Sequence, residues 1–241
     1  MSLEKGIVVA SDITQEWLLP WWWDHYQKYN SYPVTFVDLG LSNEMKAWCK
    51  EKGNYIRLVD AGLFVKEREE VDQTLAHLWE KNLGNHFWDK RRAWFRKPLA
   101  CLQSPYETSL WIDSDCEIRG PLEGAFAFCN HPSGIAAIRE TWKEKEVGIN
   151  SGVIAFKKGA PLLHKWARLA ANANDRFYGD QDLLDCIEKE QNIPLGELPS
   201  IYNWSHRCAE NPEAIILHWH GPYAKEVIAQ QLRKKNTPFI L

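Results

Sequence analysis

The sequence lacks the long apolar runs and leader segments by which membrane-spanning and secreted proteins are recognised. The apolar stretch from Leu18 to Trp23 is far too short to cross a bilayer. No basic leader precedes the first apolar segment, Gly6 to Ala10, so we expect no signal peptide. The 6 cysteines include no Cys-x-x-Cys pair, which predicts free thiols in a reducing compartment. These absences favour a cytoplasmic protein without a transmembrane segment.

Repeats, low-complexity tracts and linkers are missing as well. Without such a boundary, the 241 residues are predicted to form a single domain, residues 1–241. The net charge of -3 lacks the positive excess of nucleic-acid binders, so we expect no nucleic-acid partner. The 13 tryptophans are the unusual feature of the composition. Most are expected in the core, but a few in a cleft would suit a sugar ring or a base.

Strand-like and helix-like segments alternate from the start of the chain. Strands are predicted over 7–10, 33–38, 55–59, 109–112, 134–138, 153–156 and 214–217. Helices are predicted over 16–29 after a Ser11-Asp12 cap, 42–52, 67–83, 98–103 after Pro98, from Pro161, after Asp182 and from Lys225. The alternation predicts an α/β fold with a mostly parallel central sheet and helices on both faces.

The strand Ser109 to Ile112 ends in Asp113-Ser114-Asp115, the most informative stretch of the chain. Residues two apart on a strand point to the same side, so the two carboxylates are predicted to converge while Ser114 faces away. Two such anions repel each other unless a cation lies between them, and oxygen ligands suit magnesium or manganese. A solvated turn after the strand is the alternative, because Asp and Ser are ordinary turn residues.

Other polar segments also allow two interpretations. The basic, aromatic patch Arg91 to Lys97 is either a solvated helix face or the source of a cation for a bound phosphate. Ile149 to Gly152 is predicted to be a polar break before an apolar run, and the carboxylates of Asp180 and Asp182 fit either helix capping or a site. The basic tail from Lys225 suits contact with an anionic membrane surface or an ordinary exposed face.

Four features in this order resemble glycosyltransferase family 8. They are the apolar strand with Asp113-Ser114-Asp115, then Asn150-Ser151-Gly152-Val153, then Asp180-Gln181-Asp182, and finally a strand followed by His218-Trp219-His220-Gly221-Pro222. The resemblance covers the chain from the first strand to about Lys225. It implies the GT-A fold of nucleotide-sugar enzymes, with a metal, usually manganese, held by Asp113, Asp115 and His218. An imidazole ligand also fits manganese better than magnesium.

The resemblance further implies the residues that bind the nucleotide sugar. They are Ala10, Ser11, Asp12, Lys97, Ser114, Asn150, Ser151, Gly152, Asp182, Asn203, His220, Gly221 and Lys225. Ala10 to Asp12 would cradle the uracil and ribose. Lys225 matches the lysine of the family's H-x-x-G-x-x-K pattern, although here one extra residue separates it from Gly221. His220 is an alternative metal ligand if the strand of His218 continues to it.

The activity that the resemblance implies is retaining transfer of a hexose from a UDP-sugar to a hydroxyl acceptor, such as a glycan, a lipid-linked saccharide or a protein. Asp180 or Gln181 would lie near the anomeric carbon as the catalytic groups. Two rivals remain. A haloacid-dehalogenase-like phosphatase also places Asp-x-Asp after an apolar strand, but on its first strand. A non-catalytic member of the fold would bind the nucleotide sugar without turnover.

Overall fold

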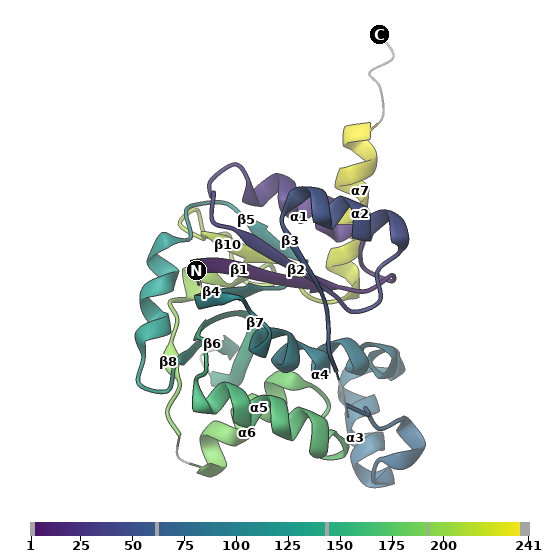
Figure 1. Cartoon of the computed structure of the whole chain (residues 1–241). Coiled ribbons are helices and arrows are strands. Elements are labelled where there is room, and N and C mark those ends of the chain that lie inside the picture. The colour runs from purple at the N-terminus through teal and green to yellow at the C-terminus, as the bar shows by residue number, and fades with distance from the viewer. Residues whose placement is uncertain (1–2, 61–62, 143–144, 192, 237–241) are drawn as a thin grey trace.

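The computed structural model describes residues 3–60, 63–142, 145–191 and 193–236. A seven-stranded sheet in the order β3-β2-β1-β4-β7-β6-β8 forms its centre (Figure 1). The strands are β1 (Leu3–Ser11), β2 (Val34–Asp38), β3 (Asn54–Arg57), β4 (Tyr106–Ile112), β6 (Ile135–Trp142), β7 (Lys145–Lys157) and β8 (Gly196–Glu197). Strands β3, β2, β1 and β4 are parallel, whereas β7 runs antiparallel to both β4 and β6. The predicted α/β fold with a mostly parallel sheet is therefore confirmed.

A second, three-stranded sheet continues directly from the first. It has the order β5-β10-β9 and comprises β5 (Cys116–Ile118), β9 (Trp204–Ser205) and β10 (Ile216–His218). Strand β5 follows β4 after three residues, and it pairs with β10 so that Cys116 lies opposite His218. The chain at 113–115 thus connects the two sheets.

Helices cover both faces of the large sheet, as Figure 1 shows. The helices are α1 (Leu18–Tyr26), α2 (Asn43–Lys52), α3 (Gln73–Leu83), α4 (Trp88–Leu102), α5 (Pro161–Asn172), α6 (Asp180–Gln191) and α7 (Pro222–Asn236). Five short 3-10 helices are η1 (Arg68–Glu70), η2 (Asn85–Phe87), η3 (Glu123–Asn130), η4 (Asn174–Arg176) and η5 (Ser200–Tyr202). The core alternates as strands require: Ile7 and Val9 pack with α1 and α2, whereas Val8 packs with α4, α5 and α6.

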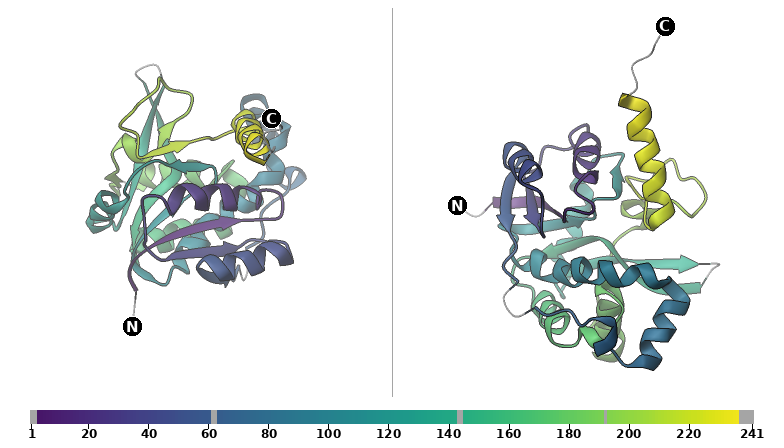
Figure 2. Two further views of the ribbon diagram at one scale, coloured as in Figure 1. Left: turned by 90° about the horizontal axis from the view of Figure 1, so that it is seen from above. Right: turned by 90° about the vertical axis from the view of Figure 1, so that its right-hand side faces the viewer.

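Helix α7 follows β10 after three residues and projects beyond the rest of the chain at its far end (Figures 1 and 2). Within the described ranges, no helix combines the length and apolar composition that a bilayer crossing requires. All six cysteines are free thiols, as predicted.

Several predicted element boundaries are wrong. The predicted Ser11-Asp12 cap does not start a helix, because Asp12 Oδ1 instead accepts from the Thr14 amide and α1 begins only at Leu18. The predicted helix over 67–83 is divided into η1 and α3, and Asp72 caps α3 by accepting from the amides of its first turn. Leu78 of α3 is 51% exposed.

Two other corrections concern elements that bear on the site. Pro98 does not open a helix but lies inside α4, which runs unbroken through the basic patch. The segment Ile149 to Gly152 is not a break, because its backbone belongs to strand β7, where Ile149 and Asn150 pair with β6 and the Gly152 carbonyl accepts from the Asp113 amide. Its polar side chains therefore have directions set by a strand, with an irregularity in the β6–β7 register beside Ile138.

Candidate active site

The candidate site lies at the carboxyl ends of β1 and β4, where ligands bind in open α/β sheets. The two strands are parallel neighbours that end at Ser11 and Ile112. Because β4 stops at Ile112, strand alternation does not govern the two aspartates that follow. They lie instead in a tight turn, closed by the Cys116 amide donating to the Asp113 carbonyl at 3.1 Å. Their carboxylates consequently have different partners.

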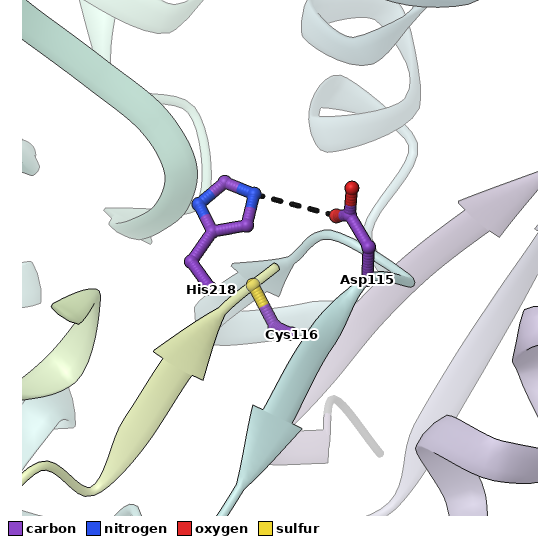
Figure 3. Close-up of side chains that lie close together, drawn as sticks. All are labelled: Asp115, Cys116 and His218. Carbon is purple, nitrogen blue, oxygen red and sulfur yellow. Dashed lines mark ion pairs between the residues drawn. The ribbon is translucent and has the colours of Figure 1, made fainter. Parts of the chain in front are cut away.

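Asp115 faces two cationic or basic groups from the end of the chain. Its Oδ1 lies 3.3 Å from His218 Nε2 (Figure 3). Its Oδ2 accepts from Lys225 Nζ at 2.6 Å. Burial raises the pKa of this carboxyl, but the charges of Lys225 and His218 outweigh it and hold the pKa well below its usual range. The extra residue before Lys225 thus does not prevent the lysine from reaching the site, since α7 begins at Pro222 immediately after Gly221.

The spacing of Asp115 and His218 suits a shared cation. Two adjacent ligands ~2.1 Å from an octahedral ion lie ~3 Å apart, close to the 3.3 Å between Oδ1 and Nε2. Among the described residues, Asp115, Cys116 and His218 form a group whose ligand atoms all lie within 4.8 Å of one another (Figure 3), and Asp113 is not a member of that group. A carboxylate oxygen and an imidazole nitrogen fit manganese by donor chemistry.

Asp113 belongs to a second cluster around Lys97. Lys97 Nζ lies 3.1 Å from Asp113 Oδ1 and 3.4 Å from Asp180 Oδ2, and it donates to both oxygens of Ser151. Burial lowers the pKa of Lys97, but the nearby carboxylates of Asp113 and Asp180 raise it by more than burial lowers it. The ammonium therefore stays charged. Trp111 completes the cluster, because its Nε1 donates to Asp113 Oδ1 at 2.6 Å.

Asp180 is almost fully enclosed in this cluster. Its Oδ2 accepts from Ser151 Oγ at 2.7 Å, and burial raises the pKa of its carboxyl although Lys97 and Ser151 oppose that rise. Lys97 comes from α4, Ser151 from β7 and Asp180 from the first turn of α6. The structure therefore brings three of the predicted site segments together around the buried ammonium of Lys97.

The polar residues of β7 also reach the histidine. Asn203 Oδ1 lies 2.8 Å from His218 Nδ1, and Asn203 Nδ2 donates to Asn150 Oδ1 at 2.9 Å. A Cβ on Gly152 would lie 2.5 Å from His218 Nδ1, so only glycine leaves room for the imidazole. The family resemblance implied that Gly152 lies by the donor sugar, and nothing in the sequence indicated this contact with His218.

Other predicted residues have local partners. Asp182 Oδ2 accepts from the Tyr178 amide, the Gln181 side chain hydrogen-bonds the Tyr178 hydroxyl, and burial raises the pKa of Asp182 to about 6. Strand β10 ends at His218, and His220 Nε2 instead meets Ser205 Oγ at 2.7 Å. Burial lowers the pKa of His220 to about 3, so its ring is neutral. The structure gives His220 no place beside Asp115 comparable to that of His218.

The nucleotide end of the predicted site lies at the end of β1. Ser11 is buried, whereas Ala10 and Asp12 are partly exposed there. Ser114 is buried in the turn between the two aspartates. These residues lie at the ends of the neighbouring strands β1 and β4, and their contact with a nucleotide stays a prediction.

Arg91, the first residue of the basic patch, fits neither predicted interpretation. Arg91 is 1% exposed, and its guanidinium donates to the carbonyls of Lys66, Asn174, Phe177 and Tyr178. It also lies against the rings of Trp79, Trp88 and Phe95. Burial lowers the pKa of Arg91 to about 10. Arg91 is thus neither a solvated residue nor a phosphate ligand but a packing centre that joins α4 to the loops around it.

No protein-family model and no curated protein matches the sequence. Solved structures do match in three dimensions. The galactosyltransferase LgtC, in complex with donor and acceptor sugar analogs, superposes with a TM-score of 0.58 and 14% identity over 97% of this chain and 98% of that one. Mouse xyloside xylosyltransferase 1 gives 0.55 and 14% over 90% of this chain and 97% of that one.

The glycosyltransferase GlyE of Streptococcus pneumoniae TIGR4 gives a TM-score of 0.60 and 17% identity over 90% of this chain. The match covers 55% of GlyE, so the chain spans about half of that protein's length. At these identities the comparisons establish the fold. The GT-A-like fold implied by the resemblance in the sequence is therefore confirmed.

Proposed function

We propose that this chain is a metal-dependent retaining glycosyltransferase that moves a hexose from a UDP-sugar to a hydroxyl acceptor, within a single GT-A domain. The observation that supports this most is the pair Asp115 and His218, 3.3 Å apart at the carboxyl edge of the sheet, with Lys225 on the free oxygen of Asp115. An anion of the size of a diphosphate would find there both an ammonium and a cation site.

Asp115 and His218 are the proposed manganese ligands, with magnesium as the alternative ion, and Asp113 is the proposed third ligand. A divalent cation bound there would offset the negative charge that develops on the leaving diphosphate. Lys225 would then exchange Asp115 for a phosphate oxygen as its partner. Asp113 would have to share its carboxylate between the cation and its present contacts with Lys97 and Trp111.

The Lys97 cluster is proposed to organise the donor sugar. Lys97 lies between Asp113 and Asp180 and contacts both, so it connects the first turn of α6 to the turn that follows β4. Asp180 and Gln181 are the proposed groups beside the anomeric carbon, where a fixed carboxylate would stabilise an oxocarbenium-like centre. Asn150, Ser151, Gly152, Asp182, Asn203, His220 and Gly221 are the proposed sugar-side residues, and Ala10, Ser11, Asp12 and Ser114 the nucleotide-side residues.

The test is release of UDP from a panel of UDP-hexoses with and without manganese. The wild-type chain should release UDP only with the metal, and Asp115→Asn should abolish this release. Glu80→Gln is the matched control, because Glu80, like Asp115, accepts from a cationic side chain, here Arg68, but lies on α3. It should retain wild-type activity.

Other outcomes would refute the proposal. Release of inorganic phosphate instead of UDP would favour the phosphatase. A UDP-hexose that stabilises the folded protein but is never turned over, with water or with saccharide acceptors, would favour the non-catalytic binder. UDP release that does not need manganese and is unchanged in Asp115→Asn would exclude a role for Asp115 and His218 in the reaction.

A further inference from the structure

Two asparagines connect the backbone of β7 to the histidine of the candidate metal pair. The Gly152 amide donates to Asn150 Oδ1 at 2.9 Å, Asn203 Nδ2 donates to the same oxygen at 2.9 Å, and His218 Nδ1 lies 2.8 Å from Asn203 Oδ1. Asn150, Asn203 and His218 are all buried. We call this chain of hydrogen bonds, Gly152 to Asn150 to Asn203 to His218, the asparagine relay.

The orientation of Asn150 is determined at both ends of its amide. A backbone N–H can only donate, so the atom of Asn150 that faces Gly152 is its oxygen. On the other side, Asn150 Nδ2 donates to a Glu140 carboxylate oxygen at 3.2 Å. A flipped amide would set donor against donor at Gly152 and acceptor against acceptor at Glu140, so one orientation alone satisfies both neighbours.

The orientation of Asn150 determines that of Asn203, and Asn203 determines the proton on His218. Because Asn150 Oδ1 can only accept, the atom of Asn203 beside it must be the amide nitrogen. The oxygen of Asn203 therefore faces His218 Nδ1, which must carry the hydrogen. With a cation between the two side chains, a neutral ring would present its lone pair on Nε2, the nitrogen that Figure 3 shows turned toward Asp115.

We propose that Asn150 and Asn203 are positioning residues that hold His218 in the tautomer protonated on Nδ1, with Nε2 ready to bind a cation beside Asp115. Ligand histidines are generally oriented by an acceptor on their second nitrogen. The use of that cation in UDP-sugar transfer rests on the proposed function, but the tautomer does not. Gly152 serves the relay twice, since its amide starts the chain and its missing side chain leaves room for the imidazole.

The first test is nitrogen-15 NMR of the metal-free full chain labelled at histidine, which reports the protons on Nδ1 and on Nε2 separately. The chain has 8 histidines, and His218 is assigned by the signals that disappear in His218→Gln. Wild type should show His218 protonated on Nδ1. Asn203→Leu, which removes the acceptor, should shift it toward the Nε2-protonated form. Asn203→Asp keeps an acceptor at that place and should retain the wild-type tautomer.

Asn150→Leu is the more discriminating variant, because Asn150 makes its relay contact with Asn203 rather than with the ring. The relay predicts that freeing Asn203 from Asn150 gives a mixture of His218 tautomers. This variant also serves if Asn203→Leu does not fold. A folded Asn150→Leu with the wild-type tautomer would overturn the relay.

The second readout is manganese affinity, measured from the free-ion signal in electron paramagnetic resonance. Asn203→Leu should bind manganese ~10- to 100-fold more weakly than wild type, and Asn203→Asp should bind it more tightly than Asn203→Leu. Unchanged affinity and tautomer in Asn203→Leu, or a wild-type His218 without a proton on Nδ1, would overturn the proposal. If the relay behaves as predicted but no UDP is released, the proposed function fails alone.

Discussion

Removing the buried ammonium of Lys97 should destabilise the protein strongly and in a pH-dependent way. In Lys97→Met the side chain keeps its length but leaves Asp180, only 3% exposed, without its cation. Asp113 is less affected, because its side chain is 26% exposed and can be hydrated. Breaking a buried ion pair from one side costs ~3–5 kcal/mol of unfolding free energy, and at this chain length that corresponds to a fall in Tm of ~6–20 °C.

The pH dependence follows from the Asp180 carboxyl. Burial already raises the pKa of Asp180, and Lys97 is the main group that opposes the rise. Without Lys97 the folded-state pKa rises further above the unfolded value. The destabilisation by the unpaired carboxylate is complete at a pH above the pKa of Asp180 in the folded state. It is relieved as the pH falls toward the pKa of Asp180 in the unfolded state, because the carboxyl takes up a proton. The stability deficit of Lys97→Met should therefore shrink as the pH falls.

Urea unfolding followed by circular dichroism measures the effect in four chains. These are wild type, Lys97→Met, Lys97→Met with Asp180→Asn, and the control Lys46→Met. The double variant has no buried charge at 180 and should recover much of the loss. Lys46 pairs with Asp38 at 3.6 Å and its side chain is 33% exposed, so the control should lose at most ~1 kcal/mol. A deficit for Lys97→Met no larger than the control's, constant with pH and not rescued by Asp180→Asn, would refute the reasoning.

Three further predictions concern single positions. Gly152→Ala places a Cβ 2.5 Å from His218 Nδ1. The overpacking should lower the free energy of unfolding by ~1–3 kcal/mol and weaken manganese binding in calorimetry. A variant that binds manganese like wild type would show that the imidazole ring can move freely. Arg91→Lys keeps the charge but loses the planar guanidinium that reaches four carbonyls. Thermal unfolding should show a loss of ~2 kcal/mol or more in unfolding free energy, with manganese affinity unchanged. An undiminished Tm would contradict the role of Arg91 in packing. Asp182→Asn should stabilise the protein above pH about 6. The raised pKa of the Asp182 carboxyl makes the unfolding free energy of the wild-type protein fall as the pH rises from 3.8 toward 6. A stability advantage of the variant that is equally large at pH 3 to 4 would rule out this cause.

Much of the fold could be predicted because it rests on local patterns. Short apolar segments alternating with amphipathic ones predicted the parallel part of the sheet, and the apolar run before Asp113 predicted a buried strand. Helix limits were harder, because Asp12 and Asp72 offer equally good capping chemistry and only Asp72 caps a helix in the structure. Pro98 likewise reads as a helix start, yet α4 tolerates it in its interior.

The sequence by itself determined which chemical groups gather at the edge of the sheet. Parallel strands end at one edge whatever the details of packing, so carboxylates placed after a strand must lie near the ends of its neighbours. Tertiary structure decided which partner each group meets. The turn after Ile112 sends Asp113 to Lys97 and Asp115 to His218, over 100 residues away. It also buried Arg91 and placed Asn203 against an imidazole that fits only over Gly152. Side-chain direction beyond the end of a strand depends on turn geometry and on the space left by distant elements, and neither is encoded in a local pattern.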